Sequence, residues 1–535
     1  MDSLYDRALS EVGHDGKYQK KYDVIYNVVF SGLWIMAYYN IIIALTIPPH
    51  ACKLPNKPDN VSANLWKLKY IPTVKDSAGE EKISDCLIYA DPESNNTKGC
   101  DFYEYETNWF ETTIPSENNW VCENELYVSN IIAYGRIGDI IGSLFFGWFG
   151  DIYGRKPTYI ISLCMIIIGR AISVIASSSY VLFTIGCIIA SFPSWSATQS
   201  TAIISLEITS SKRRATVATS RLAATSFGMC IMALVYWWFR NWKPFFIITT
   251  ATQLPYLLLC WKITESPQWL WVNRKTKECV VVLKQIAKVN GTKLSPEIEH
   301  EILTSEHVTT SKTEVLGPLS LFAGWRLAMN TILQLFLCFA DNSNGNPYLS
   351  LVWQSLAEIP GYFVASWLAD RIGRRYTGMI SSLLTTFVWM VYGYREINKA
   401  AWLRTEWLSS FLVITIRMTS TMTYYIINLF NMELYPTCLR QSGMSLGNVF
   451  SGGGGVLAPY IIYLGHRYDT RYPSAIMIAI TLSGGVLSSF LLPETLNVKL
   501  PETLEDAQKF GRRGFDRTYY TASKDNEEVI DLNTP

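Results

Sequence analysis

The stretch GWFGDIYGRK, residues Gly147–Lys156, ends a long apolar run with charged side chains. A near copy, SWLADRIGRR at 366–375, ends another apolar run in the same way. Ionisable side chains are expensive inside a bilayer, so charges directly after an apolar run indicate where a membrane helix ends. The sequence therefore uses one helix-end pattern twice.

Two further motifs are repeated in the same order. Glu207 and Arg214 close one apolar stretch, and Glu433 and Arg440 close another at the same spacing of seven residues. TESP at 264–267 is then echoed by PET at 493–495. The copies are 219 residues apart (151 to 370), 226 apart (207 to 433) and 229 apart (265 to 494). A nearly constant offset indicates two similar halves with charges at corresponding helix ends.

The composition is that of a membrane protein. Hydrophobic residues make up 49% of the 535 residues and charged residues only 17%, which excludes a disordered or an ordinary soluble chain. Apolar windows of about 20 residues, the length that crosses a bilayer as a helix, recur along the chain. We count twelve, at 24–47, 126–149, 157–178, 181–205, 215–238, 244–263, 326–342, 347–369, 376–394, 407–430, 441–464 and 472–492. The sequence therefore predicts an all-α polytopic membrane protein, whose first span acts as the insertion signal.

These spans predict the order of the domains. We expect an N-terminal arm (1–22), a first six-helix bundle (23–263) with a long loop at 48–125, a linker (264–325), a second bundle (326–492) and a tail (493–535). Positive charges gather in the short connections after the second, fourth, eighth and tenth spans. By the positive-inside rule, both termini and the linker are cytoplasmic. No basic face with interleaved aromatic residues points to nucleic acid.

The 48–125 loop is too long for a simple connection and predicts a small folded cap outside the cell. It carries Cys52, Cys86, Cys100 and Cys122, and disulfides persist there, although sequence leaves three pairings open. Asn60 and Asn95 fit the glycosylation pattern. Asn290 fits it too, but it lies on the expected inner side.

Several polar and aromatic residues within the spans are candidates for a substrate site. Trp34 and Tyr38 share a helical face, which favours packing, with a ring face for a cationic ligand as the alternative. Arg136 and Asp139 are spaced to neutralise each other, which favours a structural ion pair over a substrate contact. The other candidates are Gln199 in span 4, Gln354 and Glu358 in span 8, and Arg417 and Tyr424 in span 10.

The seventh span is shorter than the others. From Arg326 the apolar run reaches only Ala340 before a polar stretch, and fifteen residues are too few for a full crossing. Either this helix breaks early over a water-filled cavity or the chain lacks a segment.

The repeated motif resembles the GxxxDRxGRR loop of the major facilitator superfamily, with Ile152 and Ser366 as departures. ESPQW (265–269), AEIPG (357–361), ELYPTCLR (433–440) and PETLNVKLPET (493–503) are more specific. With the cysteine-bearing loop, they resemble the organic cation, carnitine and organic anion carriers. Sugar porters share some of these elements but lack this loop.

The resemblance implies a fold and a mechanism. It implies twelve transmembrane helices in two six-helix bundles around a cavity that opens alternately to each side. Charged helix ends would then bridge the bundles while the cavity faces outward, or else only fix the topology. These gate candidates are Asp151, Arg155, Glu207, Arg214, Asp370, Arg374, Glu433 and Arg440.

The resemblance also bears on the substrate. Glu358 and Arg417 match a helix 8 glutamate and a helix 10 arginine of the cation carriers, where the carboxylate would attract a cation; a purely structural ion pair is the alternative. Gly452 stands where cation carriers have aspartate and anion or carnitine carriers have arginine, so the usual indication of substrate charge is missing. The aromatic residues and Glu358 favour an amine or a zwitterion.

We therefore expect a plasma-membrane carrier of small organic cations or zwitterions that works by alternating access. The alternatives are an organic anion or sugar carrier, or a receptor on the carrier scaffold that does not transport. An enzyme is not expected, because the five histidines are dispersed and no catalytic group or metal cluster is recognisable. The expected partners are a small organic solute and the lipid bilayer, without cofactor or metal; oligomeric state and ion coupling stay open.

Overall fold

The computed structural model describes most of both halves. It describes residues 4–54, 63–75, 81–90, 96–193, 195–210, 213–304, 347–397, 405–449, 453, 471–491 and 494–495. The expected seventh span, Gly452, the acceptors Asn60 and Asn95 and the tail after Thr495 lie outside these residues.

The spans of the N-terminal half are formed by helices. The first span joins α2 (Lys17–Tyr22), a π-helix η1 (Asp23–Val29) and α3 (Phe30–Ala44). The next spans are α6 (Leu126–Tyr153), α7 (Arg155–Ile175), α8 (Tyr180–Ser191) with α9 (Ser196–Glu207), α10 (Arg214–Phe239), and α11 (Trp242–Ala251) with α12 (Leu254–Leu258). Among the described residues, four helical stretches are long and apolar enough to cross a membrane: Lys17–Ala44, Arg155–Ile175, Tyr180–Glu207 and Arg214–Phe239.

Within two of the predicted spans the helix is interrupted. Span 4 breaks between α8 and α9, next to Pro193, and span 6 breaks between α11 and α12, next to Pro255. Proline has no backbone N–H to donate and its ring displaces the preceding turn, so apolar length alone does not preserve a helix there.

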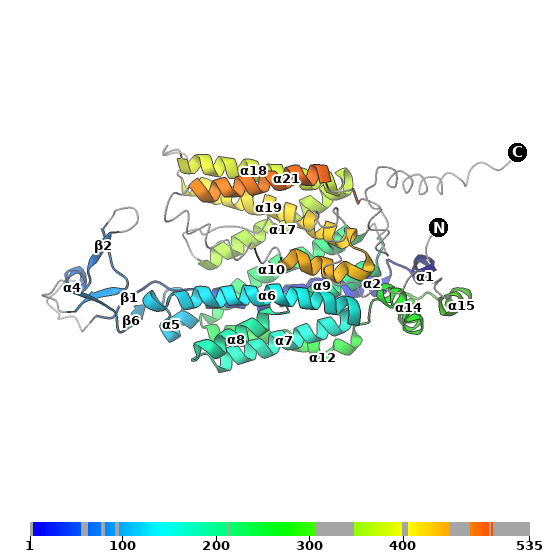
Figure 1. The fold of residues 1–535 in the computed structure, drawn as a ribbon, viewed down its shortest axis with the longest axis horizontal. Coiled ribbons are helices and arrows are strands. Elements are labelled where there is room, and N and C mark those ends of the chain that lie inside the picture. Colours follow the sequence, from blue (N-terminus) through cyan, green and yellow to red (C-terminus); the bar gives the residue numbers. More distant parts are fainter. Residues whose placement is uncertain are drawn as a thin grey trace.

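The C-terminal half stacks on the N-terminal half. Its described helices are α17 (Pro347–Ile372), α18 (Arg374–Ile397), α19 (Glu406–Leu434) and α21 (Arg471–Leu491), with the short η8 (Thr437–Leu439) followed by a helical stretch at 440–449. In Figure 1, α17, α18, α19 and α21 lie on one side and α6, α7 and α8 on the other, with α9 and α10 between them. The two halves meet where α10 packs along α17.

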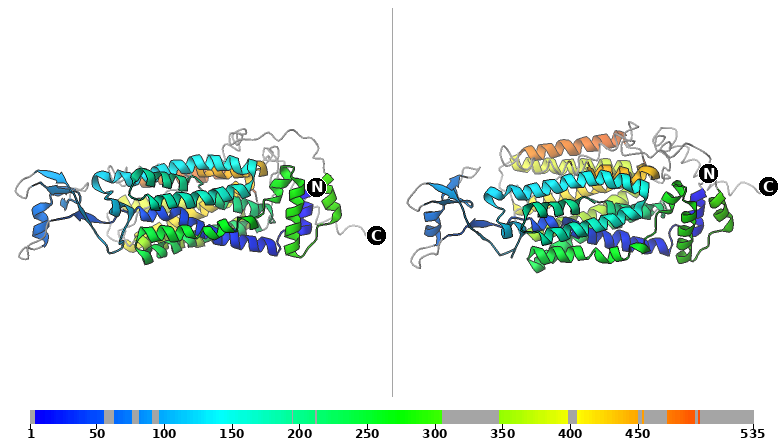
Figure 2. Two further views of the ribbon diagram at one scale, coloured as in Figure 1. Left: turned by 90° about the horizontal axis from the view of Figure 1, so that it is seen from below. Right: turned by 60° about the horizontal axis from the view of Figure 1, so that its bottom comes forward.

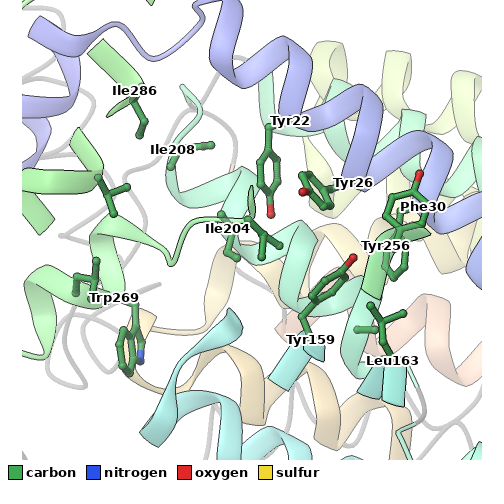
Figure 3. Close-up of a cluster of buried hydrophobic side chains, with 14 of the residues drawn as sticks. Tyr22, Tyr26, Phe30, Tyr159, Leu163, Ile204, Ile208, Tyr256, Trp269 and Ile286 are labelled. Carbon is green, nitrogen blue, oxygen red and sulfur yellow. The ribbon is translucent and has the colours of Figure 1, made fainter. Parts of the chain in front are cut away.

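An aromatic cluster holds the N-terminal half together (Figure 3). Phe30 lies 5.0 Å from Tyr256 and 5.2 Å from Tyr159, measured between ring centroids, and Tyr26 packs against both tyrosines. Tilted and edge-to-face pairs of this kind are favourable beyond the apolar area they bury. The cluster thus ties the first span to α7 and α12.

The 48–125 loop forms a cap of three two-stranded antiparallel sheets. They pair β1 (His50–Cys52) with β6 (Tyr103–Tyr105), β2 (Thr73–Lys75) with β3 (Glu81–Ile83), and β4 (Leu87–Tyr89) with β5 (Thr97–Gly99), and α4 (Ala63–Tyr70) and α5 (Ile114–Asn118) complete the cap. Disulfides join Cys52 to Cys100 and Cys86 to Cys122, which is one of the three pairings left open.

The opposite end of the molecule carries the N-terminal arm and the linker helices (Figure 2). Helix α1 (Leu4–Val12) packs on α14 (Thr276–Asn290) and α15 (Pro296–Thr304), which follow α13 (Pro267–Val272). The Asn290 amide donates to the carbonyls of Val12 and Gly13 and accepts from the Tyr18 N–H, so its side chain is occupied by the arm. We call this end the linker end and the other the cap end.

Candidate gate and substrate site

Each copy of the repeated motif turns the chain through a glycine. Gly154, between α6 and α7, has φ +108°, and a Cβ there would lie 2.3 Å from Glu265 Oε2. The Glu265 carboxylate accepts the N–H groups of Arg155 and Lys156, each at 3.0 Å. It thereby satisfies donors that the first turn of α7 would leave free. Burial raises the pKa of Glu265, and the backbone N–H groups bonded to it oppose the shift.

The second half repeats this arrangement. Gly373 has φ +100°, and Glu494 accepts the N–H groups of Arg374 at 2.8 Å and Arg375 at 3.2 Å. The TESP and PET elements therefore each supply the glutamate that caps the helix after the loop motif. Their shared offset was visible in the sequence, but their structural role was not.

In the first half, the motif arginine is fully buried at the linker end. The Arg155 guanidinium lies 3.4 Å from Asp151 and 3.8 Å from Glu207. It also donates to the carbonyl of Thr437, at 2.9 Å, in the opposite half. Asp151, Arg155 and Glu207 thus form one cluster that reaches across the molecule.

Two further contacts cross between the halves at this end. Asp151 accepts the backbone N–H groups of Gln441 at 3.3 Å and Ser442 at 2.9 Å, and Arg440 donates to Glu207 at 2.7 Å. The side chains of Arg440 and Glu207 are fully buried. Charge-assisted hydrogen bonds in such a water-poor site hold the helix ends of the two halves together.

The second-half motif makes the same local contacts. Arg374 lies 3.1 Å from Asp370 and 3.6 Å from Glu433, and Thr495 donates to Glu433 at 2.6 Å. Arg214, from the first half, is an electrostatic neighbour of Glu433. The Asp370 side chain, however, is 46% exposed, and in the described residues its ion pair is with Arg374 at the start of the next helix, α18.

Glu358 and Arg417 come together near the middle of the C-terminal helices. Their charged atoms are 3.9 Å apart, and Ser226 of α10 donates to the second Glu358 oxygen at 2.5 Å. Gly361 permits this approach, because a Cβ there would lie 2.9 Å from the Met418 carbonyl of α19. The side chains of Glu358 and Arg417 remain 22% and 31% exposed, so this carboxylate at the seam between the halves stays open to a ligand.

The other proposed substrate contacts are distributed differently. Trp34 is fully buried in the aromatic cluster of the N-terminal half, and Gln199 is buried on α9. Tyr38 lines a small pocket with Arg136 and Asp139, whose charged atoms are 3.4 Å apart. Tyr424 is half-buried on α19, facing the same seam as Glu358, whereas the side chain of Gln354 lies outside the described residues.

Sequence reasoning missed three residues beside Glu358. Ser226 on α10 donates to Glu358, and Tyr362 on α17 is an electrostatic neighbour of Glu358, Tyr424 and Arg221 of α10. Arg221 had a visible signal, since an arginine within an apolar span is a functional candidate by default. Tyr362 and Ser226 had none.

Comparison with known proteins places the chain in a family. Residues 100–506 match the family model described as sugar (and other) transporter. The chain is 28% identical to an organic cation transporter protein of Drosophila melanogaster, over 95% of both chains. It is 26% identical to solute carrier family 22 member 1 of Bos taurus, over 95% of this chain and 93% of that protein. It is 25% identical to a beta-alanine transporter of Drosophila melanogaster, over 94% of this chain and 89% of that protein.

The fold has a counterpart among solved structures. A major facilitator proton:xylose symporter bound to 6-bromo-6-deoxy-D-glucose superposes with a TM-score of 0.57 at 17% identity, over 73% of this chain and 91% of the symporter. This similarity confirms the major facilitator fold expected from the repeated motifs. Because the family model spans most of the sequence, the chain belongs to the sugar (and other) transporter family, and it is a multi-pass membrane transporter rather than an enzyme.

Proposed function

We propose that this protein carries small organic cations or zwitterions across the plasma membrane by alternating access. The observation that carries the proposal is the partly exposed Glu358 carboxylate at the seam between the halves, bonded to Ser226 of one half and paired with Arg417 of its own. A carboxylate held in this way attracts an ammonium group, while Arg417 offsets the cost of keeping it charged without substrate. The organic cation and beta-alanine carriers among the relatives support this substrate class over sugars.

The linker end would be the cytoplasmic gate. Asp151, Glu207 and Arg155 bind the 437–442 segment of the other half, so the cavity opens towards the cap while these contacts last. Substrate passes inward once they break. A cytoplasmic linker end agrees with the positive charges in its short loops, and an external cap agrees with the two disulfides.

The test is uptake of a labelled panel by cells that express the chain. The panel holds a quaternary amine, a biogenic amine, carnitine, a neutral amino acid, an organic anion and glucose. We expect saturable uptake of an amine or a zwitterion. Uptake of only the anion or glucose, or binding without uptake by purified protein in liposomes, would contradict the proposal.

The variant E358Q links the activity to the site. It keeps the shape of the side chain and removes the charge, so the KM for a quaternary amine should rise at least ~10-fold, the loss of one charge-assisted contact. E278Q, at the start of the linker helix α14, is the matched control and should leave KM unchanged. An equal loss for a quaternary amine and for a neutral substrate would make Glu358 a structural residue.

A further inference from the structure

Arg221 is the exception among the buried arginines. Five arginines in the described residues are buried, namely Arg155, Arg170, Arg221, Arg374 and Arg440. Four of them donate to acceptors at 3.2 Å or less: backbone carbonyls for Arg155, Arg170 and Arg374, and Glu207 for Arg440. Arg221 is 4% exposed, and within the described part of the chain no hydrogen bond or ion pair reaches its guanidinium.

A buried cation without a partner is costly. The penalty for removing an ion from water is still several kcal/mol after relaxation, and it is recovered only by a counter-charge or by hydrogen bonds. Arginines retained inside a membrane span at this cost mark substrate or ion sites. Arg221 therefore awaits an anionic partner that the described residues do not provide.

The position of Arg221 points to the substrate. Its electrostatic neighbours are the phenols of Tyr362 and Tyr424. Tyr362 is also the neighbour of Glu358 and lies one helical turn after it on α17. On α10, Arg221 precedes Ser226, the residue that bonds to Glu358, by five residues, or ~7.5 Å along the axis. A carboxylate and a guanidinium that no described residue pairs with thus belong to one cluster, offset along the interface between the halves.

We propose that Arg221 binds the anionic group of a zwitterionic substrate whose ammonium group faces Glu358. This inference rests on the proposed function and adds its substrate class. The offset along α10 suits a betaine or an ω-amino acid with several carbons between its charges better than an α-amino acid, whose charges are separated by one carbon. The two parallel N–H groups of a guanidinium also match the two oxygens of a carboxylate. They would not match the ammonium group of a substrate.

The test compares 4-(trimethylammonio)butyrate with its methyl ester, two ligands that differ in the anionic charge. Each competes against uptake of labelled tetraethylammonium, so neither has to be transported. On the wild type the acid should inhibit at least ~10-fold more strongly than the ester, the factor for one charge-assisted contact. In R221Q the two should inhibit within about twofold of each other, while tetraethylammonium uptake persists. R221K keeps the positive charge but loses the forked guanidinium, so its preference for the acid over the ester should lie between those of the wild type and R221Q.

The control is R240Q, at the residue that directly follows α10 and outside the site, where the guanidinium donates to the carbonyls of Thr107 and Asn108. It should keep the wild-type preference. Equal inhibition of the wild type by the acid and the ester would overturn the inference, and this result does not depend on whether R221Q reaches the cell surface. An unchanged preference for the acid in R221Q would also overturn it. A wild type that moves no cation or zwitterion would overturn the proposed function instead, and this inference with it.

Discussion

The two copies of the loop motif share their local construction but differ in what they bind. In both, an aspartate pairs with the arginine one turn later, a glutamate from a later helix joins them, and a second glutamate caps the next helix. Asp151 is buried and accepts two N–H groups from the opposite half. Asp370 is 46% exposed and pairs within its own half.

The difference teaches that the repeat encodes a helix end and not by itself a gate. A motif closes the gate more firmly where the opposite half presents more donors to it. The 440–442 segment presents a guanidinium and two N–H groups to Glu207 and Asp151, whereas Glu433 has Arg214 as its electrostatic neighbour from the other half. We infer that the first-half motif carries most of the free energy that closes the linker end. Five experiments can break or sharpen this comparison.

The largest effect is expected from R440Q. It leaves Glu207 buried without its ion-pair partner from the opposite half, and loss of one member of a buried pair costs about 3–5 kcal/mol. We expect opening of the linker end by at least ~100-fold. The reporter is the maleimide reactivity of S445C in purified protein, because Ser445 is buried against Gly147 of the other half.

The matched control is R214Q, the equivalent arginine of the first half. If the comparison is right, R214Q raises S445C reactivity much less than R440Q does. Equal increases would show that both motifs close the gate.

The second comparison is D151N against D370N. Asp151 gives its charge to two N–H groups across the interface, so D151N should weaken closure by about 2–3 kcal/mol. D370N removes an exposed pair and should cost less than about 1 kcal/mol. In proteoliposomes, D151N should slow transport while substrate affinity stays nearly intact. D370N should change neither the transport rate nor the substrate affinity. Loss of binding in D151N would make Asp151 a folding residue.

How much of this the sequence could predict differs between the fold and the site. The spans, the two halves and the local Asp–Arg spacing follow from hydropathy and offsets, because they depend on nearby residues. The breaks at Pro193 and Pro255 were equally local but were hidden by unbroken apolar runs. The contacts of Asp151 with residues 441 and 442, and the lack of a partner for Arg221 among the described residues, depend on packing between helices far apart in the sequence. Residue spacing does not predict such packing.

The third experiment tests what the copies have in common. Glu265 and Glu494 each cap a helix with two N–H bonds, so E265Q and E494Q should lower thermal stability by similar amounts, about 1 kcal/mol each. Thermal unfolding of the purified variants measures both. A loss of thermal stability in only one of the two variants would mean that the two glutamate caps are not equivalent.

The smallest effect concerns the N-terminal arm. The Tyr5 hydroxyl donates to the Glu207 carbonyl at 2.9 Å. Loss of this bond in Y5F should destabilise the closed linker end by about 0.5–1 kcal/mol and so raise S445C reactivity a few-fold. Y105F, which removes a hydroxyl bonded to Asn119 in the cap, is the control and should change nothing at the linker end. A Y5F protein identical to wild type would exclude the arm from the gate.

The most direct test measures the distance between spin labels at Tyr153 and Ile372, which are exposed and occupy equivalent positions at the linker end of the two halves. Without substrate, pulsed electron–electron double resonance should give a distance distribution dominated by short distances. A saturating quaternary amine should add a population with a longer distance. The D151N protein should show this longer-distance population even without substrate, whereas the D370N protein should not. One distance that neither the amine nor D151N changes would contradict alternating access closed by the first-half motif.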